Sequence, residues 1–434
     1  MSALAYHRLP RGWEVRPLKR IAALNPEVLP EDTDPEWTFP YVDIGNVTFE
    51  AGITGTELVR FADAPSRARR RVRNGDTIVS TVRTYLRAIA PVWNQPDDLI
   101  VSTGFAVIRA RPPMDAGYLS WALRSNTFVE SVVADSVGVS YPAIAPSVLG
   151  SLPVPAPPPA KQHAIADFLE RETAKIDALI ATQERLIALL DEKRQATITH
   201  AVTKGLDPNV PMKESGDEMF PAIPAGWTVK RLKYLAGEVT VGVVVTPSKY
   251  YADSGVPALR SLNVRPMEIA KDELVFFDEA SNRILAKSML RAGDLVAVRT
   301  GKPGTTAVIG DDLDGANCID LILIRRSPRF DSRFLGFVLN SDLARAQFTQ
   351  GSEGALQQHF NIETAKNLLL PVPSRREQAD ISEYLDNSLR QFDASRGDCE
   401  RMIDTLRERR TALVTAAVTG QIDVSRAAIT EAAE

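Results

Sequence analysis

Apolar side chains recur at helical spacing through the middle of the chain, from Gln162 to Asp207. Most of them are three, four or seven residues apart, with charged residues in between: Ile165, Leu169, Ile176, Leu179, Leu186, Leu190 and Ile198. This spacing is typical of a long amphipathic helix with a coiled-coil seam. Pro159 suits the start of such a helix, and Gly205 suits its end. About 40 helical residues span roughly 60 Å, which is longer than a compact domain needs.

The same pattern occurs a second time, 216 residues further along the chain, from Gln378 to Asp423. The two segments share 17 identical residues in 46 aligned positions without a gap. Ser374, followed by Glu377, matches the capping-box pattern of a helix start, and the second helix is expected to end near Gly420. The chain therefore contains an internal duplication.

The segments that precede the two helices also echo each other. The motif Pro-Ala-Gly-Trp at Pro224–Trp227 repeats Pro-Arg-Gly-Trp at Pro10–Trp13, and short β-rich runs alternate with helical patterns in both globules. The run Tyr118–Val133 predicts one amphipathic helix. We expect an α+β protein with two α/β domains and two long helices. The predicted boundaries are 1–155 for the first domain, 156–207 for the central helix, 208–373 for the second domain, 374–423 for the C-terminal helix and 424–434 for a tail.

The composition is that of an ordinary globular protein, with 44% hydrophobic and 24% charged residues. No apolar run approaches the ~18 residues of a membrane span, and the first residues lack a signal-peptide pattern. We therefore expect a cytoplasmic protein. The two cysteines, Cys318 and Cys399, lie in segments of different character, so neither a disulfide nor a zinc site is expected.

The net charge of −4 does not by itself indicate a nucleic-acid ligand, and the local distribution of charge is more informative. Residues 58–90 contain only Asp63 and Asp76 against eight arginines: Arg60, Arg67, Arg69, Arg70, Arg71, Arg73, Arg83 and Arg87. Such a cluster is either an ordinary solvated surface or a surface that faces phosphates.

Patterns typical of catalysis do not occur in this sequence. Thr300–Thr305 (Thr-Gly-Lys-Pro-Gly-Thr) has the wrong order for a phosphate-binding Walker loop, and no Gly-x-Gly-x-x-Gly loop follows a predicted strand. The four histidines are dispersed, and neither a Gly-x-Ser-x-Gly elbow nor an Asn/Asp-Pro-Pro-aromatic tetrapeptide is present. We expect no catalytic residues, no metal site and no cofactor in this chain.

Polar and aromatic loop residues are instead suited to binding DNA. Arginine can contact guanine through two hydrogen bonds, asparagine and glutamine can contact adenine in the same way, and hydroxyl groups can bind phosphates. The alternative is that these residues only end strands and form turns. The candidates in the first domain are Ser80, Arg83, Thr84, Tyr85, Arg87, Ser102, Thr103, Ser140 and Tyr141; those in the second are Arg299, Thr300, Lys302, Thr305, Asn317, Gln357 and His359.

Taken together, these motifs resemble the DNA-specificity subunit of type I restriction–modification systems. The resemblance rests on the paired Leu-Pro-Val-Pro junctions at Leu152 and Leu370, the run Asp191–Pro208, and the recognition-domain segment Gly138–Ile144. They occur in the family's order along nearly the whole chain, and the junctions occur twice.

The resemblance implies two target-recognition domains that each read one half of a bipartite, asymmetric DNA site. It also implies that the two helices pack antiparallel, set the spacer length and dock two adenine methyltransferase subunits that carry S-adenosylmethionine. A motor–nuclease restriction subunit that uses ATP and Mg would complete the complex. The seam residues expected to face each other are Ile165, Leu169, Ile176 and Leu190 on one helix and Ile381, Leu385, Phe392 and Leu406 on the other. The alternative function is that of a coiled-coil assembly adaptor that does not read DNA.

Overall fold

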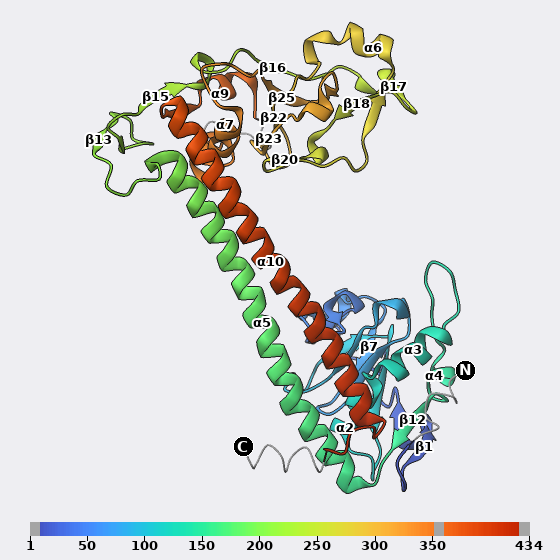
Figure 1. The fold of residues 1–434 in the computed structure, drawn as a ribbon. Coiled ribbons are helices and arrows are strands. Elements are labelled where there is room, and N and C mark those ends of the chain that lie inside the picture. Colours follow the sequence, from blue (N-terminus) through green and yellow to red (C-terminus); the bar gives the residue numbers. More distant parts are fainter. Residues whose placement is uncertain (1–8, 351–359, 425–434) are drawn as a thin grey trace. The chain divides into compact units, whose positions relative to one another are not determined.

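The computed structural model describes residues 9–350 and 360–424, and it divides the chain into two compact units. The first unit contains Met1–Glu184 and Glu400–Glu434, and the second contains Arg185–Cys399. Each unit therefore combines one globular lobe with part of each long helix (Figure 1). We describe the two units separately.

Two four-stranded sheets form the first lobe. The first sheet has the order β6 (Glu57–Arg60), β3 (Thr38–Val42), β10 (Ile100–Ser102) and β7 (Ala68–Arg71); the second has the order β2 (Ala22–Leu24), β11 (Phe105–Ala110), β8 (Thr77–Ser80) and β9 (Ile89–Pro91). The pairing of β3 with β10 is parallel, and the other pairings are antiparallel. The smaller elements are β1 (Glu14–Pro17), which pairs with β12 (Pro153–Ala156), β4 (Val47–Thr48), which pairs with β5 (Gly52–Ile53), and the helices α1 (Leu18–Ile21), α2 (Ala116–Leu123), α3 (Asn126–Ala134) and α4 (Pro146–Leu149).

The predicted single helix over Tyr118–Val133 is in fact two helices, so that prediction was wrong. The chain breaks at Arg124–Ser125, where the Ser125 hydroxyl accepts a hydrogen bond from the backbone N–H of Phe128 (3.4 Å) and caps α3. A serine cap satisfies an N–H group that a continuous helix would have bonded to its own backbone.

The second lobe has the same plan. Its sheets have the orders β17 (Tyr251–Ala252), β21 (Val275–Phe277), β18 (Val256–Leu259), β24 (Asn317–Cys318) and β16 (Val239–Val241), β25 (Leu321–Ile324), β22 (Leu295–Val298), β23 (Thr306–Val308). One pairing in the first of these sheets, β18 with β24, is again parallel. The smaller elements are the pairs β15 (Thr228–Arg231) with β26 (Leu369–Val372) and β19 (Val264–Arg265) with β20 (Glu268–Ile269), and the helices α6 (Glu279–Ile284), α7 (Ser332–Leu339), α8 (Asp342–Gln350) and α9 (Ile362–Asn367). The duplication in the sequence is therefore a duplication of fold.

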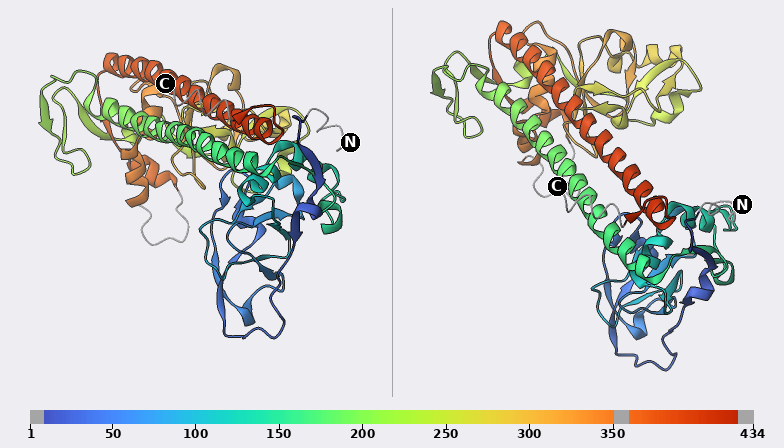
Figure 2. Two further views of the ribbon diagram at one scale, coloured as in Figure 1. Left: turned by 90° about the horizontal axis from the view of Figure 1, so that it is seen from below. Right: turned by 60° about the horizontal axis from the view of Figure 1, so that its bottom comes forward.

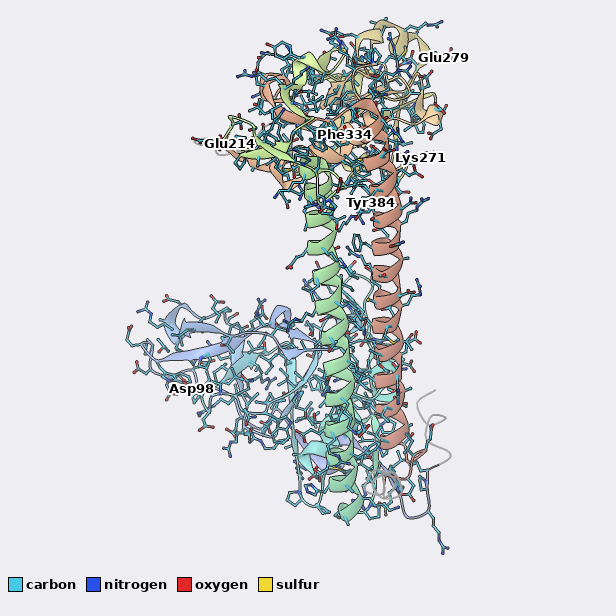
Figure 3. The ribbon with its side chains drawn as sticks, turned by 60° about the vertical axis from the view of Figure 1, so that its left-hand side comes forward. Asp98, Glu214, Lys271, Glu279, Phe334 and Tyr384 are labelled. Carbon is cyan, nitrogen blue, oxygen red and sulfur yellow. The ribbon has the colours of Figure 1, made fainter. Side chains whose placement is uncertain are left out.

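A small hairpin of β13 (Met212–Glu214) and β14 (Ala222–Pro224) precedes the second lobe. Figure 3 shows Glu214 on this hairpin, which extends away from the sheets of the lobe. In the first lobe the same view places Asp98 in a loop at the end of the lobe away from α5.

The long helices are α5 (Pro159–Lys204) and α10 (Arg375–Val418). As predicted, Ser374 and Glu377 cap the start of α10: the Glu377 carboxylate accepts from the Ser374 N–H (3.0 Å), and the Ser374 hydroxyl accepts from the Glu377 N–H (3.3 Å). α5 ends at Lys204, and Gly205 follows with φ +77°. This left-handed conformation favours glycine and suits a helix end.

Within each unit the two helices lie side by side and antiparallel, in all the views of Figures 1 and 2. Ion pairs define the register. In the first unit Arg410 pairs with Asp177 (2.9 Å) and Arg407 with Glu184 (3.8 Å). In the second unit Arg396 pairs with Asp191 (3.1 Å), and Arg194 pairs with Asp393. The predicted fold class, with two α/β domains and two antiparallel long helices, is confirmed.

The predicted seam residues pack within their own units. Ile165 and Leu169 belong to the core of the first lobe, together with Val414 and Val418 of α10. Ile381 and Leu385 belong to the core of the second lobe, together with Ile198 and Val202 of α5. Ile176 and Leu406 are also buried, whereas Leu190 and Phe392 are half-buried. The antiparallel register brings residue 177 opposite 410, so it does not align residues that are equivalent in the repeat.

A glutamine at the start of each long helix connects the helix to its lobe. The Gln162 side chain accepts from the Asp115 N–H (2.7 Å) and donates to the Pro157 carbonyl (2.8 Å). Gln378 makes the same two bonds, to Asp331 (2.7 Å) and Pro373 (3.0 Å). Both glutamines are buried, so each satisfies backbone groups that would otherwise lack a partner.

Candidate nucleic-acid interface

The first candidate loop follows β8 and contains a single turn, Thr84–Leu86, between two arginines. Arg83 has φ 50° and Arg87 has φ 52°, so both adopt the left-handed conformation that residues other than glycine rarely take. Each such residue costs about 1–3 kcal/mol and persists only where the surroundings hold it in place. Here the Thr84 hydroxyl donates to the Ser136 hydroxyl (2.8 Å), which ties this loop to the loop after α3.

The loop after α3 comprises residues 137–143 and lies against the first loop. Ala143 bridges to both Val137 and Val82, and the Ile144 N–H donates to the Thr81 carbonyl (2.9 Å). The Arg83 guanidinium lies 5.0 Å from the centre of the Tyr141 ring, as in a cation–π contact. The structure therefore brings together Arg83, Tyr85, Arg87, Ser140 and Tyr141, whose side chains are all exposed. We call this surface of residues 83–87 and 137–143 the first-lobe loop surface.

The other arginines of the basic segment are engaged differently. Arg60 pairs with Glu36 (3.0 Å), Arg67 with Asp43 (2.5 Å) and Arg73 with Glu27 (2.7 Å). In the part of the chain that the structure describes, no carboxylate lies within ion-pair distance of Arg83 or Arg87. A guanidinium without a counter-charge is free to pair with a phosphate or the edge of a guanine. The first-lobe loop surface therefore carries two exposed arginines whose charge is available for a ligand, and the exposed Arg71 of β7 is a third arginine for which no ion pair is seen among the described residues.

Three predicted contact residues of the first lobe lie inside it. Ser80 donates to the Val82 carbonyl (2.6 Å), Thr84 binds Ser136, and the Ser102 hydroxyl accepts from the Gly104 N–H (3.3 Å). All three are buried, so their hydroxyl groups shape the loops and do not face a ligand. Thr103 is exposed, and its N–H donates to the Arg67 carbonyl (2.7 Å).

In the second lobe the corresponding loop follows β22. Arg299 is half-buried and pairs with Asp320, which itself has φ 50°. Lys302 is exposed, and its carbonyl accepts from the Thr305 hydroxyl (2.9 Å), which closes a turn that contains Gly304. Thr300 is half-buried. The Lys302 side chain of this loop is therefore accessible to a ligand, whereas Arg299 is already paired with a carboxylate.

Asn317 is fully buried. Its side-chain nitrogen donates to the Asn282 side chain (2.7 Å), and its side-chain oxygen accepts from the Cys318 N–H (2.9 Å). These bonds hold β24 against the segment around α6, so the amide is not available to a base. Gln357 and His359 lie outside the described residues.

Exposed apolar residues in the loops of both lobes were not among the candidates predicted from the sequence. In the first lobe they are Leu86, Val137 and Val139. In the second they are Val244 and Val245, which follow Val243; the Val243 carbonyl accepts from the N–H of Asp320 (3.1 Å). The available signal was an apolar residue beside Gly138 or Thr246 in a segment otherwise typical of a loop.

No arrangement typical of a metal site or a reactive thiol occurs among the described residues. No group of three or more His, Cys, Asp or Glu side chains could hold a metal ion there. Burial raises the pKa of the Cys318 thiol to about 12, so this sulfur stays protonated at neutral pH and is a poor nucleophile. In the same described part of the chain, no helix is long and apolar enough to cross a membrane.

The fold and these loops define a class of protein: a duplicated recognition protein in which similar lobes present dissimilar loops. A family model for the type I restriction modification DNA specificity domain matches residues 10–188. The chain is 26% identical over 275 residues to the type I restriction enzyme EcoBI specificity subunit of Escherichia coli, and 25% identical over 284 residues to the MjaVIII specificity subunit of Methanocaldococcus jannaschii. Residues 10–188 therefore match a DNA specificity domain, and the chain is similar to the specificity subunits of type I restriction–modification systems.

These matches cover 61% and 63% of this chain, and 55% and 63% of the two relatives. Solved structures support the same fold. A chain from a study of complex assembly and conformational transition in a type I restriction–modification system superposes with a TM-score of 0.73 at 23% identity, covering 96% of this chain and 100% of that chain. The HsdS subunit of Thermoanaerobacter tengcongensis gives a TM-score of 0.52 at 22% identity, covering 96% of this chain and 99% of that one.

Proposed function

We propose that this chain reads a bipartite, asymmetric DNA site and directs partner subunits to it. Each lobe would read one half of the site. The observation that carries the proposal is the contrast between like lobes and unlike loops: Arg83 and Arg87 are exposed and free of carboxylates in the first, whereas Lys302 is exposed and Arg299 is paired in the second. Different side chains on the same framework are what recognition of two different half-sites requires.

The long helices would set the separation of the two half-sites and bind the partners. We propose two adenine methyltransferase subunits, which carry S-adenosylmethionine, and restriction subunits that use ATP and Mg. The chain itself would supply no catalytic group, and the complex would work in the cytoplasm. The similarity to type I specificity subunits and the continuous helices α5 and α10 support this assignment.

Mapping methylated adenines in the source genome tests the proposal directly. With the gene intact, we expect methylation at one motif with two short specified halves and an unspecified spacer. Deleting this gene alone should abolish methylation at that motif, because the methyltransferase subunits would lose their DNA-reading partner. Methylation that persists in the deletion strain would contradict the proposal.

Arg83→Ala is expected to weaken binding to the mapped site by about 1–3 kcal/mol, with a much smaller loss on random DNA, because a guanidinium that binds a base edge confers specificity. The measurement is a titration of labelled duplexes with the assembled complex at fixed salt. Arg60→Ala serves as the matched control, since Arg60 already pairs with Glu36 and Asp63. Equal losses on both duplexes would make Arg83 a phosphate contact.

A coiled-coil assembly adaptor remains the second candidate function, because it accounts for the paired helices. It leaves the exposed arginines of the first-lobe loop surface without a role. The two functions differ in DNA binding: a reader binds its site with an affinity that falls steeply as salt rises, whereas an adaptor does not bind DNA.

A further inference from the structure

The tip of the first-lobe loop surface is apolar. Val137 is 81% exposed, Val139 is 102% exposed and Tyr141 is 67% exposed, while Leu86 of the adjacent loop is 47% exposed. Single exposed apolar residues are ordinary on a protein surface, whereas a group of them commonly marks an interaction site. Val139 is the most exposed of the four.

This tip is held open by its backbone. Val137 and Ala143 exchange two hydrogen bonds of 2.9 Å each, and Ala143 also bridges to Val82. Gly138 has φ +121°, and a Cβ at this position would lie 3.1 Å from the Tyr141 carbonyl oxygen. The backbone is therefore hydrogen-bonded on both sides of the tip, and the two valine side chains are exposed there.

The charges beside the tip indicate its ligand. Arg83 and Arg87 border the apolar residues, and neither has a carboxylate partner among the described residues. An apolar tip beside guanidinium groups that lack a carboxylate partner fits a polyanion that also presents an apolar group. In the major groove of DNA that group is the C5-methyl of thymine, which alanine, threonine and phenylalanine side chains contact in known complexes.

The shape of valine favours a thymine methyl over a gap between two base pairs. Side chains that wedge between base pairs are typically Phe, Leu, Ile, Met or Pro. Valine is short and stiff at χ1, so it reaches a methyl group at the surface of the groove without needing to separate stacked bases.

We propose that Val139 recognises a thymine methyl group in the half-site that the first lobe reads. The proposal rests on the proposed function, since it requires this lobe to contact the major groove. It assigns an apolar specificity contact to a surface whose other contacts are charged or polar.

The test compares thymine with deoxyuridine, which differs only by the missing methyl group. The assembled complex is titrated with two duplexes that carry the mapped site, one with thymine and one with deoxyuridine at every thymine of the first-lobe half-site. We expect the wild type to bind the deoxyuridine duplex roughly fourfold more weakly, the fold-change that corresponds to about 0.8 kcal/mol for one buried methyl-sized group. Val139→Ala, which loses both γ-methyl groups and so retracts the apolar surface, and Val139→Asn, which replaces them with a polar amide, should bind the thymine duplex more weakly by a similar factor and should no longer distinguish the two duplexes.

Val15→Ala is the matched control, because Val15 is 43% exposed on β1, which pairs with the strand just before α5. It should keep the wild-type preference for thymine. Deoxyuridine placed in the other half-site should leave the effect of Val139→Ala unchanged.

Two results would overturn the inference while leaving the proposed function standing. One is an undiminished preference for thymine in Val139→Ala. The other is a normal DNA affinity in Val139→Ala together with weaker assembly with the methyltransferase, which would make the tip a protein contact. If instead the wild type fails to distinguish the mapped site from random DNA, the proposed function itself fails.

Discussion

Replacing Asp294 by Ala is expected to lower the free energy of unfolding of the second unit by about 3–5 kcal/mol. Asp294 is fully buried, and its carboxylate accepts from Arg325 Nη1 (2.6 Å), the Arg326 N–H (2.9 Å) and the Arg291 N–H (3.0 Å). Removing the carboxylate leaves a largely buried guanidinium without a counter-charge and two N–H groups without an acceptor. Both effects disfavour the folded state.

Amide hydrogen exchange in β22 and β25 would measure this loss, because these strands pair beside Asp294. Asp294→Leu combined with Arg325→Met should be far less destabilising, since a buried ion pair replaced by apolar side chains leaves no unpaired charge. If the double variant were as unstable as Asp294→Ala, burial of the lone guanidinium would not be the cause.

The first lobe provides a matched comparison. Asp76 is buried and accepts a hydrogen bond from Arg109 Nη2 (2.7 Å), as Asp294 does from Arg325. Arg109 also pairs with Glu27, and that hydrogen bond lowers the pKa of the Glu27 carboxyl. Glu27 keeps part of the counter-charge in place when Asp76 is removed, so Asp76→Ala should cost less, about 2 kcal/mol.

The sequence predicts features that depend on neighbouring residues, and it does not predict features that depend on residues far apart in the chain. Helix ends depend on neighbouring residues, so the capping box at Ser374 and the end of α5 before Gly205 were predictable. Ion pairing depends on residues far apart in the sequence. Nothing near Arg67 shows that Asp43, 24 residues away, pairs with it while no carboxylate pairs with Arg83.

The burial of polar loop residues could not be predicted from the sequence either. Asn317 was predicted to bind DNA as an edge-on amide, yet its side-chain N–H donates a hydrogen bond to the Asn282 side chain, 35 residues away, inside the lobe. The register of the two long helices could not be predicted from the sequence for another reason. A repeat shows which residues are equivalent, but the antiparallel pairing of Asp177 with Arg410 decides which residues meet.

Replacing Trp227 by Ala is expected to cost about 3–5 kcal/mol of the second unit's stability, as is typical of a large buried side chain. Trp227 is 1% exposed, and its indole N–H donates to the Glu377 carboxylate (3.1 Å), which also caps α10. The variant would therefore lose core packing and a support of the helix start together. Trp227→Phe should lose less, about 1–2 kcal/mol, because the ring volume is largely kept and one hydrogen bond is lost.

Trp13, the equivalent residue of the repeat, is the control that the chain itself supplies. It is half-buried, its indole nitrogen has no hydrogen-bond partner among the described residues, and Lys161 stands where Glu377 stands in the second copy. Trp13→Ala should therefore cost less than about 2 kcal/mol. Hydrogen exchange in β15 and the first turn of α10, compared with β1 and the first turn of α5, would measure both losses. Equal losses at the two tryptophans would show that the Glu377 contact and the deeper burial of Trp227 add nothing, and that the shared Gly-Trp motif alone sets the stability of each junction.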